Sequence, residues 1–96
     1  MIAYIRDSKL IIGNIGDSSA ILIRDNKTFE LTSEQTPNRI DEYKRIISSN
    51  GLILPVGDTM RVGGVLSVSR AIGDLPYKEY VIGEPEVTTI NLTVGD

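Results

Sequence analysis

Apolar residues in the first third of the chain fall in short runs that polar triplets separate. Four such runs are predicted to be β-strands: Ile2–Arg6, Leu10–Gly16, Ser19–Arg24 and Thr28–Thr32. Short runs rich in β-branched residues and bounded by turn residues are typical of antiparallel strands. The polar triplets 7–9 and 25–27 predict three-residue turns, and the whole segment is predicted to be a meander. The apolar density of Leu10–Ile15 and Ala20–Ile23 predicts central strands that are covered on both faces.

The period of the apolar positions changes in residues 39–49. Apolar side chains recur there at helical spacing, at Ile40, Tyr43, Ile46 and Ile47. This spacing predicts one amphipathic helix. Asn38 is the expected N-cap, and Gly51 is expected to end the helix with a positive φ. Asp41 and Arg45 are four residues apart, and we expect them to pair on the solvent face of the helix.

The second half of the chain is less regular. Leu52–Val56 and Met60–Val62 flank a Gly-Asp pair and predict a hairpin. Residues 61–74 have no sustained period, which favours a structured loop or one helical turn. Residues 75–86 hold two prolines and are predicted to be loop, and Val87–Val94 alternates as a last strand. The predicted fold class is α+β, with mostly antiparallel β-sheet and one main helix.

The composition excludes several classes of chemistry. The 96 residues include no Cys and no His, which removes disulfide scaffolds, thiolate nucleophiles and catalytic imidazoles. The net charge is −3 and the basic residues are scattered, so neither nucleic acid nor a membrane is an expected partner. No apolar run is long enough to span a bilayer, and the first ten residues lack the apolar core of a signal peptide. We therefore expect a cytoplasmic protein.

Asp17 is the first candidate for chemistry. It follows the apolar run 10–15 inside the segment GNIGDS, between glycine and serine. A carboxylate at the end of a strand, beside glycines that allow close approach, is a suitable ligand for Mg²⁺ or Mn²⁺. The alternative is an ordinary turn, because Gly, Asn, Asp and Ser are also the common turn residues. Spacing alone leaves both interpretations open.

Arg70 is the second candidate, in the glycine-rich segment 61–74. Its planar set of donors suits a phosphate group. The alternatives are a surface arginine or an internal pair with Asp74, four residues later. The glycines of this segment lack the spacing of a phosphate-binding P-loop. The remaining carboxylates show no pairing that is typical of acid–base catalysis.

Four segments together resemble the protein phosphatase 2C family, the metal-dependent Ser/Thr phosphatases. They are LIIGNIGDSSAIL from Leu10, LTSEQTPNRIDEYKRIISSNG from Leu31, RVGGVLSVSRAIGD from Arg61, and Glu84-Pro85-Glu86-Val87. Their order and gaps agree with the family over nearly the whole chain. The third segment, with Lys78 after it, is the most specific of the four.

The resemblance implies a fold and a reaction. The fold is an α/β/β/α sandwich of two antiparallel sheets, of which this chain is a part. The reaction is hydrolysis of phosphoserine and phosphothreonine in proteins by a water that two Mg²⁺ or Mn²⁺ ions activate. By the resemblance, Asp17 corresponds to a peripheral third metal site and Arg70 lies near the substrate cleft. The loop or flap region corresponds to residues 61–86.

The resemblance also implies that catalytic elements are missing. The metal-binding Asp-Gly elements and the phosphate-binding arginine of the family have no counterpart here, so no catalytic residue is assigned. We therefore expect residues 1–96 to be a single incomplete domain, the middle part of a larger one, and to be inactive alone. Ser19 replaces a common arginine, and Glu34-Gln35-Thr36-Pro37 replaces a usual Asp-His-Lys-Pro. A non-catalytic, partner-binding relative is thus the alternative.

A part of a two-sheet domain is expected to expose strand edges and an apolar sheet face. Identical edges can complete each other's sheets. We therefore expect the chain to self-associate, with exchange of strands as one route.

Overall fold

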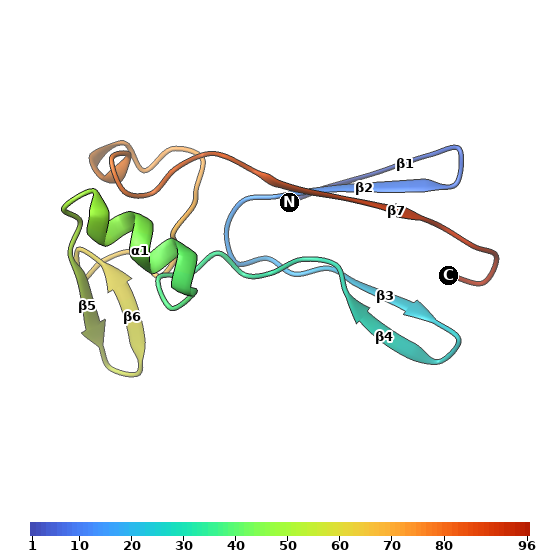
Figure 1. Cartoon of the computed structure of the whole chain (residues 1–96), viewed down its shortest axis with the longest axis horizontal. Helices are drawn as coiled ribbons and strands as arrows, with labels where there is room; N and C mark the ends of the chain where they lie inside the picture. The colour runs from blue at the N-terminus through green and yellow to red at the C-terminus, as the bar shows by residue number, and fades with distance from the viewer.

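A computed structural model describes residues 1–96. The elements in chain order are β1 (Ile2–Arg6), β2 (Lys9–Asn14), β3 (Ile21–Arg24), β4 (Lys27–Glu30), α1 (Ile40–Ser48), β5 (Ile53–Val56), β6 (Thr59–Val62), the 3₁₀ turn η1 (Leu75–Tyr77) and β7 (Glu86–Asn91). The molecule is elongated, measuring 47 × 25 × 18 Å. One end holds α1, β5, β6 and η1, and the other end holds the remaining strands (Figure 1). The predicted α+β class, mostly antiparallel with one helix, is confirmed.

The larger sheet has the strand order β1-β2-β7, and both pairs are antiparallel. The prediction that β2 is a central strand is confirmed, but the predicted meander is wrong because β2 pairs with β7 and not with β3. The backbone N–H of Gly16 donates to the side chain of Gln35 at 2.6 Å, so the chain leaves the sheet after β2. A hairpin from β2 to β3 therefore does not form.

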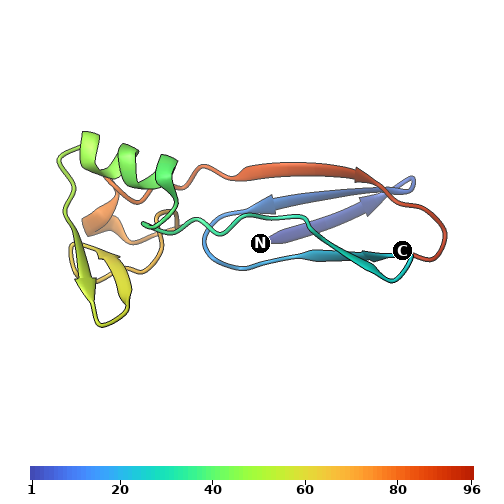
Figure 2. The ribbon, with the colours of Figure 1, turned by 60° about the horizontal axis from the view of Figure 1, so that its bottom comes forward.

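The hairpin β3–β4 forms a separate two-stranded sheet. It runs beside the larger sheet in both ribbon views (Figures 1 and 2). Leu22 is buried, whereas Ile21 and Ile23, which point to the opposite face, are 56% and 59% exposed. The prediction that this strand is central and covered on both faces is therefore wrong. One face of β2 is also open, because Ile12 is buried while Ile11 is 37% exposed.

The first two hairpins are closed by two residues each, and the prediction of three-residue turns is wrong. Asp7 and Ser8 have φ values of 50° and 61°, and Asp25 and Asn26 have values of 52° and 58°. Positive φ at both positions is the type I′ conformation, whose twist matches that of the flanking strands. Lys9 and Lys27, assigned to the turns from the sequence, are instead the first residues of β2 and β4.

Helix α1 lies where the apolar spacing places it, but its ends differ from the expectation. The N-cap is Arg39 rather than Asn38, and no side chain caps this end. At the other end Asn50, not Gly51, has the positive φ of 62°. The backbone N–H of Gly51 donates to the carbonyl of Ile46 at 2.9 Å, as in a Schellman motif. Gly51 is needed for space, because a Cβ there would lie 2.6 Å from Ile46 Cγ2.

The irregular segments close a small core beside α1. The hairpin β5–β6 turns at Gly57 and Asp58 as predicted. The core consists of Ile46 on α1, Val62 on β6 and Val81 after η1, with partly buried side chains packed around them. Arg61 and Val62 belong to β6, and residues 63–74 form a loop. The predicted loop 75–86 contains the single turn η1 and ends at Glu86, the first residue of β7.

Little of the molecule is buried for its size. Only 11 of 96 residues are buried, and the accessible surface is 6471 Å². A compact protein of this mass has about 5,400 Å². The radius of gyration is 15.7 Å, against about 12.5 Å for a compact domain of this length. No helix of the chain has the length and apolar character that crossing a membrane requires.

Candidate functional site

Asp17 and Arg70, the two residues that the sequence singles out, line the same cavity. Its volume is about 520 Å³, and its lining comes from the start of the chain, from residues 13–18 and 68–72, and from Pro85. Asp17 is the one carboxylate of this lining and Arg70 the one basic side chain. Apart from Ser18, the other lining residues are apolar or glycine, so Asp17 and Arg70 supply the charged side chains of the cavity.

Asp17 lies just beyond the end of β2. Gly16 before it has a φ of +103°, a conformation that favours glycine and turns the chain away from the sheet. Asp17 is exposed and takes part in none of the ion pairs of the chain. No group of three or more acidic side chains is arranged to hold a metal ion. Asp17 therefore offers one free carboxylate to a ligand.

Arg70 is held by internal contacts, although it borders the cavity. Its side chain is 12% exposed. Nε and Nη2 donate to Glu42 Oε1 at 3.0 and 2.6 Å, and Nη1 donates to the carbonyl of Glu84 at 3.0 Å. The internal partner is thus Glu42 on α1, and the pairing with Asp74 that the sequence offered as an alternative is wrong.

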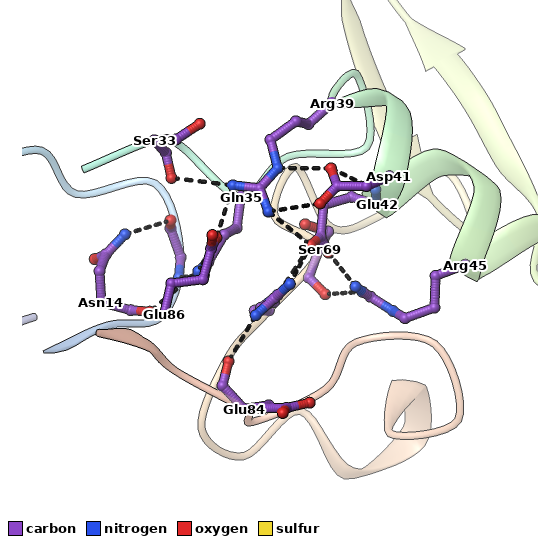
Figure 3. Close-up of polar contacts among 12 residues, drawn as sticks. Asn14, Ser33, Gln35, Arg39, Asp41, Glu42, Arg45, Ser69, Glu84 and Glu86 are labelled. Atoms are coloured by element: carbon purple, nitrogen blue, oxygen red, sulfur yellow. Dashed lines mark hydrogen bonds and ion pairs between the residues drawn. The ribbon is translucent and has the colours of Figure 1, made fainter. Parts of the chain in front are cut away.

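Glu42 is the acceptor on which three arginines converge. Its side chain is fully buried, and besides Arg70 it accepts from Arg45 and, at 3.2 Å, from Arg39 (Figure 3). Burial raises the pKa of the Glu42 carboxyl, but the hydrogen bonds from Arg70 and Arg45 outweigh this effect and the net pKa is lowered. The predicted pair between Asp41 and Arg45 is therefore wrong, because Arg45 turns inward to Glu42.

Gln35 and Glu86 extend this set of contacts toward the cavity. Gln35 is fully buried, and its Nε2 donates to Glu86 Oε1 at 2.9 Å. Arg39 Nη1 lies 2.7 Å from the same oxygen. The hydrogen bond from Gln35 and the contacts with Arg39 lower the pKa of the Glu86 carboxyl. Arg39 also pairs with Asp41, which lowers the pKa of that carboxyl.

Sequence reasoning missed both Glu42 and Gln35. For Glu42 a signal exists, because Glu42 and Arg45 have the i,i+3 spacing at which helical side chains meet. The signal did not distinguish a surface pair from a buried one. For Gln35 no local signal exists, since its partners are 19, 21 and 51 residues away.

Known proteins resemble this chain in sequence and in structure. The sequence profile described as Protein phosphatase 2C matches residues 1–96, which is the whole chain. The chain belongs to the protein phosphatase 2C family. The resemblance that the four segments carry is thereby confirmed.

Relatives within the protein phosphatase 2C family match over most of the chain. "Probable protein phosphatase 2C 78" of Arabidopsis thaliana is 43% identical over 96 residues, and "Probable protein phosphatase 2C 11" of the same plant is 45% identical over 85 residues. These matches cover 100% and 88% of this chain. The chain spans 23% of the length of each relative.

A solved phosphatase structure shares the fold of this chain over most of its length. A phosphatase from a pathogenic strain of Toxoplasma gondii superposes with a TM-score of 0.78 at 34% identity. The match covers 88% of this chain and 28% of that one.

The protein phosphatase 2C family is metal-dependent. This chain places one carboxylate, Asp17, at the cavity, and the neighbouring acidic groups Glu42 and Glu86 are occupied by arginines. One exposed carboxylate fits a single ion that keeps most of its water ligands. It does not fit a centre that holds two ions, so residues 1–96 alone do not form such a centre.

Proposed function

We propose that this chain is the middle part of a protein phosphatase 2C domain that hydrolyses phosphoserine and phosphothreonine in proteins. The observation that carries the proposal is the cavity that Asp17 and Arg70 share, in a chain that matches the family from end to end. Residues 61–86 are the proposed loop or flap region of that domain. The proposed location is cytoplasmic, and phosphoproteins rather than nucleic acids or membranes are the proposed partners.

The proposed cofactor is Mg²⁺ or Mn²⁺, with Asp17 as the ligand of a peripheral ion. Its support is a free carboxylate at a strand end with open space beside it. In the complete domain, bound ions supply a nucleophilic water and neutralise charge on the phosphoryl oxygens. Residues 1–96 contribute only the peripheral ligand, so we propose that they are inactive alone.

The proposed role of Arg70 is to border the substrate cleft. Glu42 and the carbonyl of Glu84 engage three of its N–H groups. A guanidinium group has five such donors, so two remain for a phosphoryl oxygen. Because the side chain is fixed, binding a substrate costs little further side-chain entropy.

A chimera tests the proposed function. Residues 1–96 replace the matching segment of the Arabidopsis relative described as protein phosphatase 2C 78, to which they align over their full length. We expect the chimera to hydrolyse a phosphothreonine peptide with Mn²⁺ and the 96-residue chain alone not to. Turnover by the chain alone contradicts the proposal. A folded chimera that binds the peptide without turnover indicates the non-catalytic binding module instead.

Asp17→Asn in the same chimera tests the metal role. The amide keeps the shape of the side chain and removes its charge, so Asp17→Asn is expected to raise the Mn²⁺ concentration that half-maximal activity requires. Asp58→Asn, in the exposed turn between β5 and β6, is the matched control and is expected to leave it unchanged. Equal Mn²⁺ dependence of all three chimeras contradicts the assignment of Asp17.

We also propose that the chain binds a second copy of itself. Four apolar side chains of the larger sheet point to the same open face: Ile2, Tyr4, Ile11 and Val87. β1 is an edge strand of that sheet. A second copy that covers this face, or adds a strand to this edge, removes apolar surface from water.

A further inference from the structure

We propose that Gln35 is a positioning residue: its side-chain amide holds the turn before Asp17, and its backbone carbonyl holds the segment that carries Arg70. The proposal deepens the proposed function and rests on it for the role of the cavity. The contacts themselves are independent of that role, because they link Gln35 to the turn at residues 14–16, to Ser69 and to Glu86, and none of them involves a metal or a substrate. Their consequence is that one buried residue sets the distance between the two charged groups of the cavity.

Gln35 contacts the turn before Asp17 through three hydrogen bonds. The N–H of Gly16 donates to Gln35 Oε1 at 2.6 Å, and Gln35 Nε2 donates to the carbonyl of Asn14 at 3.1 Å. The backbone N–H of Gln35 also donates to the carbonyl of Gly16 at 3.1 Å. Three hydrogen bonds therefore fix residues 14–16, and Asp17 is the next residue along the chain.

Gln35 also contacts the other wall of the cavity. The N–H of Ser69 donates to the backbone carbonyl of Gln35 at 3.0 Å, and Ser69 directly precedes Arg70. Gln35 Nε2 also reaches Glu86 at the start of β7 (Figure 3). Gln35 thus joins three segments that are far apart in sequence, and two of them line the cavity.

The chemistry of the site requires an uncharged side chain with both an acceptor and a donor. A carboxylate in place of the amide accepts from Gly16 but has no donor for Asn14 and repels Glu86. A neutral imidazole has one acceptor and one donor, whereas a protonated imidazole has two donors and no acceptor. A histidine at this position is therefore expected to accept a hydrogen bond from the N–H of Gly16 only above the pKa of the histidine.

The first test is amide hydrogen exchange, followed residue by residue by NMR on the 96-residue chain. Gln35→Ala is expected to speed exchange at Gly16 by about tenfold or more, because that amide loses its acceptor. It is also expected to move the resonances of Asp17 and Arg70, while the β1–β2 amides stay protected. Glu34→Ala, at the exposed neighbouring residue, is the matched control and is expected to change neither. Unchanged exchange and resonances in Gln35→Ala overturn the proposal.

The second test is a pH profile of Gln35→His, which also decides the question if Gln35→Ala does not fold. Protection of Gly16 is expected at pH 8 and its loss is expected at pH 5. The ordinary histidine pKa is about 6.5; at this position the charge of Glu86 raises the histidine pKa, whereas burial lowers it. Arg39, which pairs with Glu86, is the other charged group facing this position. The natural chain has no histidine, so its profile is expected to be flat there. A flat profile in Gln35→His overturns the proposal.

A titration with Mn²⁺ separates this proposal from the proposed function. If Asp17 binds the ion, the resonances of residues 16–18 broaden in the natural chain and broaden less in Gln35→Ala. Effects of Gln35 on exchange without broadening by Mn²⁺ support the positioning role and count against the metal role of Asp17. Equal broadening in both chains, with unchanged exchange, overturns the positioning role and leaves the metal role standing.

Discussion

Glu42 takes part in three ion pairs, with arginines that come from different parts of the chain. Arg39 precedes α1, Arg45 lies on it, and Arg70 comes from the loop beyond β6. A buried carboxylate is costly unless it is paired, and the three arginines share Glu42 as an acceptor. At the residue scale, the Glu42 carboxylate therefore connects the segments around α1.

Removing that charge is expected to destabilise the protein strongly. Glu42→Gln leaves Arg45 and Arg70 without a carboxylate partner, at a cost of about 3 kcal/mol in the free energy of unfolding. Asp41→Asn is the control, because the Asp41 side chain is 63% exposed and its pair with Arg39 is worth about 1 kcal/mol or less. Urea denaturation of both variants measures the difference. Equal losses in the two variants contradict the role given to Glu42.

The lowered pKa of Glu42 predicts how stability depends on pH. The pKa lies below its ordinary value of 4.5 in the folded protein, so the unfolded chain binds more protons as the pH falls. The stabilisation is therefore complete above pH 4.5 and is lost as the pH falls through the folded value. Asp41, Glu86 and Asp96 also have lowered pKa values and act in the same direction.

Urea denaturation between pH 7 and pH 3 checks this prediction. The natural chain is expected to lose stability below about pH 4.5, and Glu42→Gln is expected to lose less over the same range. The decline that remains in Glu42→Gln comes from the other three carboxyl groups. Parallel curves for the two proteins exclude a contribution from Glu42.

At the scale of the element, the end of α1 has one position, Gly51, where only glycine fits without a steric clash. Gly51 follows Asn50, which provides the left-handed turn, and its own φ is not positive. A Cβ at Gly51 would lie 2.8 Å from the carbonyl oxygen of Ile46 and 2.9 Å from Tyr80 Cδ1. The close approach fixes the angle at which the chain leaves the helix toward β5.

Gly51→Ala is therefore expected to destabilise the protein by about 1–3 kcal/mol, because the new Cβ forces the end of the helix and Tyr80 to move apart. Gly13→Ala is the matched control, since a Cβ at Gly13 meets no atom within 4 Å and its φ is not positive. Thermal denaturation of the two variants gives the comparison. A neutral Gly51→Ala contradicts the steric explanation.

At the scale of the whole molecule, the exposed surface is larger than a chain of this mass needs. The excess over a compact protein is roughly 1,000 Å². A standard interface buries about 800 Å² on each partner, so the excess is enough for one such contact. The apolar face of Ile2, Tyr4, Ile11 and Val87 is part of this surface.

Tyr4→Lys is expected to shift the chain toward the monomer. Tyr4 is 53% exposed and lies directly opposite Ile11 on the open face, so a charge there opposes burial of this face by a second copy. Ser49→Lys, at the exposed end of α1, adds the same charge elsewhere and is the control. Light scattering after size-exclusion chromatography at micromolar concentration measures the mass. A monomeric natural chain contradicts the proposed self-association.

Local patterns in the sequence predict most of the elements. The period of apolar residues places α1 and the strands because it depends only on neighbours along the chain. The predictions that were wrong concern groups that have more than one possible hydrogen-bond or ion-pair partner. Asn38 does not cap α1, Arg45 turns away from Asp41, and β3 pairs with β4 rather than with β2, while the Gly16 N–H donates to Gln35.

The same distinction between local pattern and distant contacts holds for the candidate site. Asp17 and Arg70 were chosen by residue type and by resemblance, but their shared cavity depends on contacts of Gln35 and Glu42 with distant segments. The sequence by itself determined the α+β class, the single helix, the hairpins and membership of the protein phosphatase 2C family. Only the tertiary structure decided which strands pair, which charges are buried and which two residues face one cavity. Those outcomes depend on groups 19 to 51 residues apart that compete for the same few hydrogen bonds.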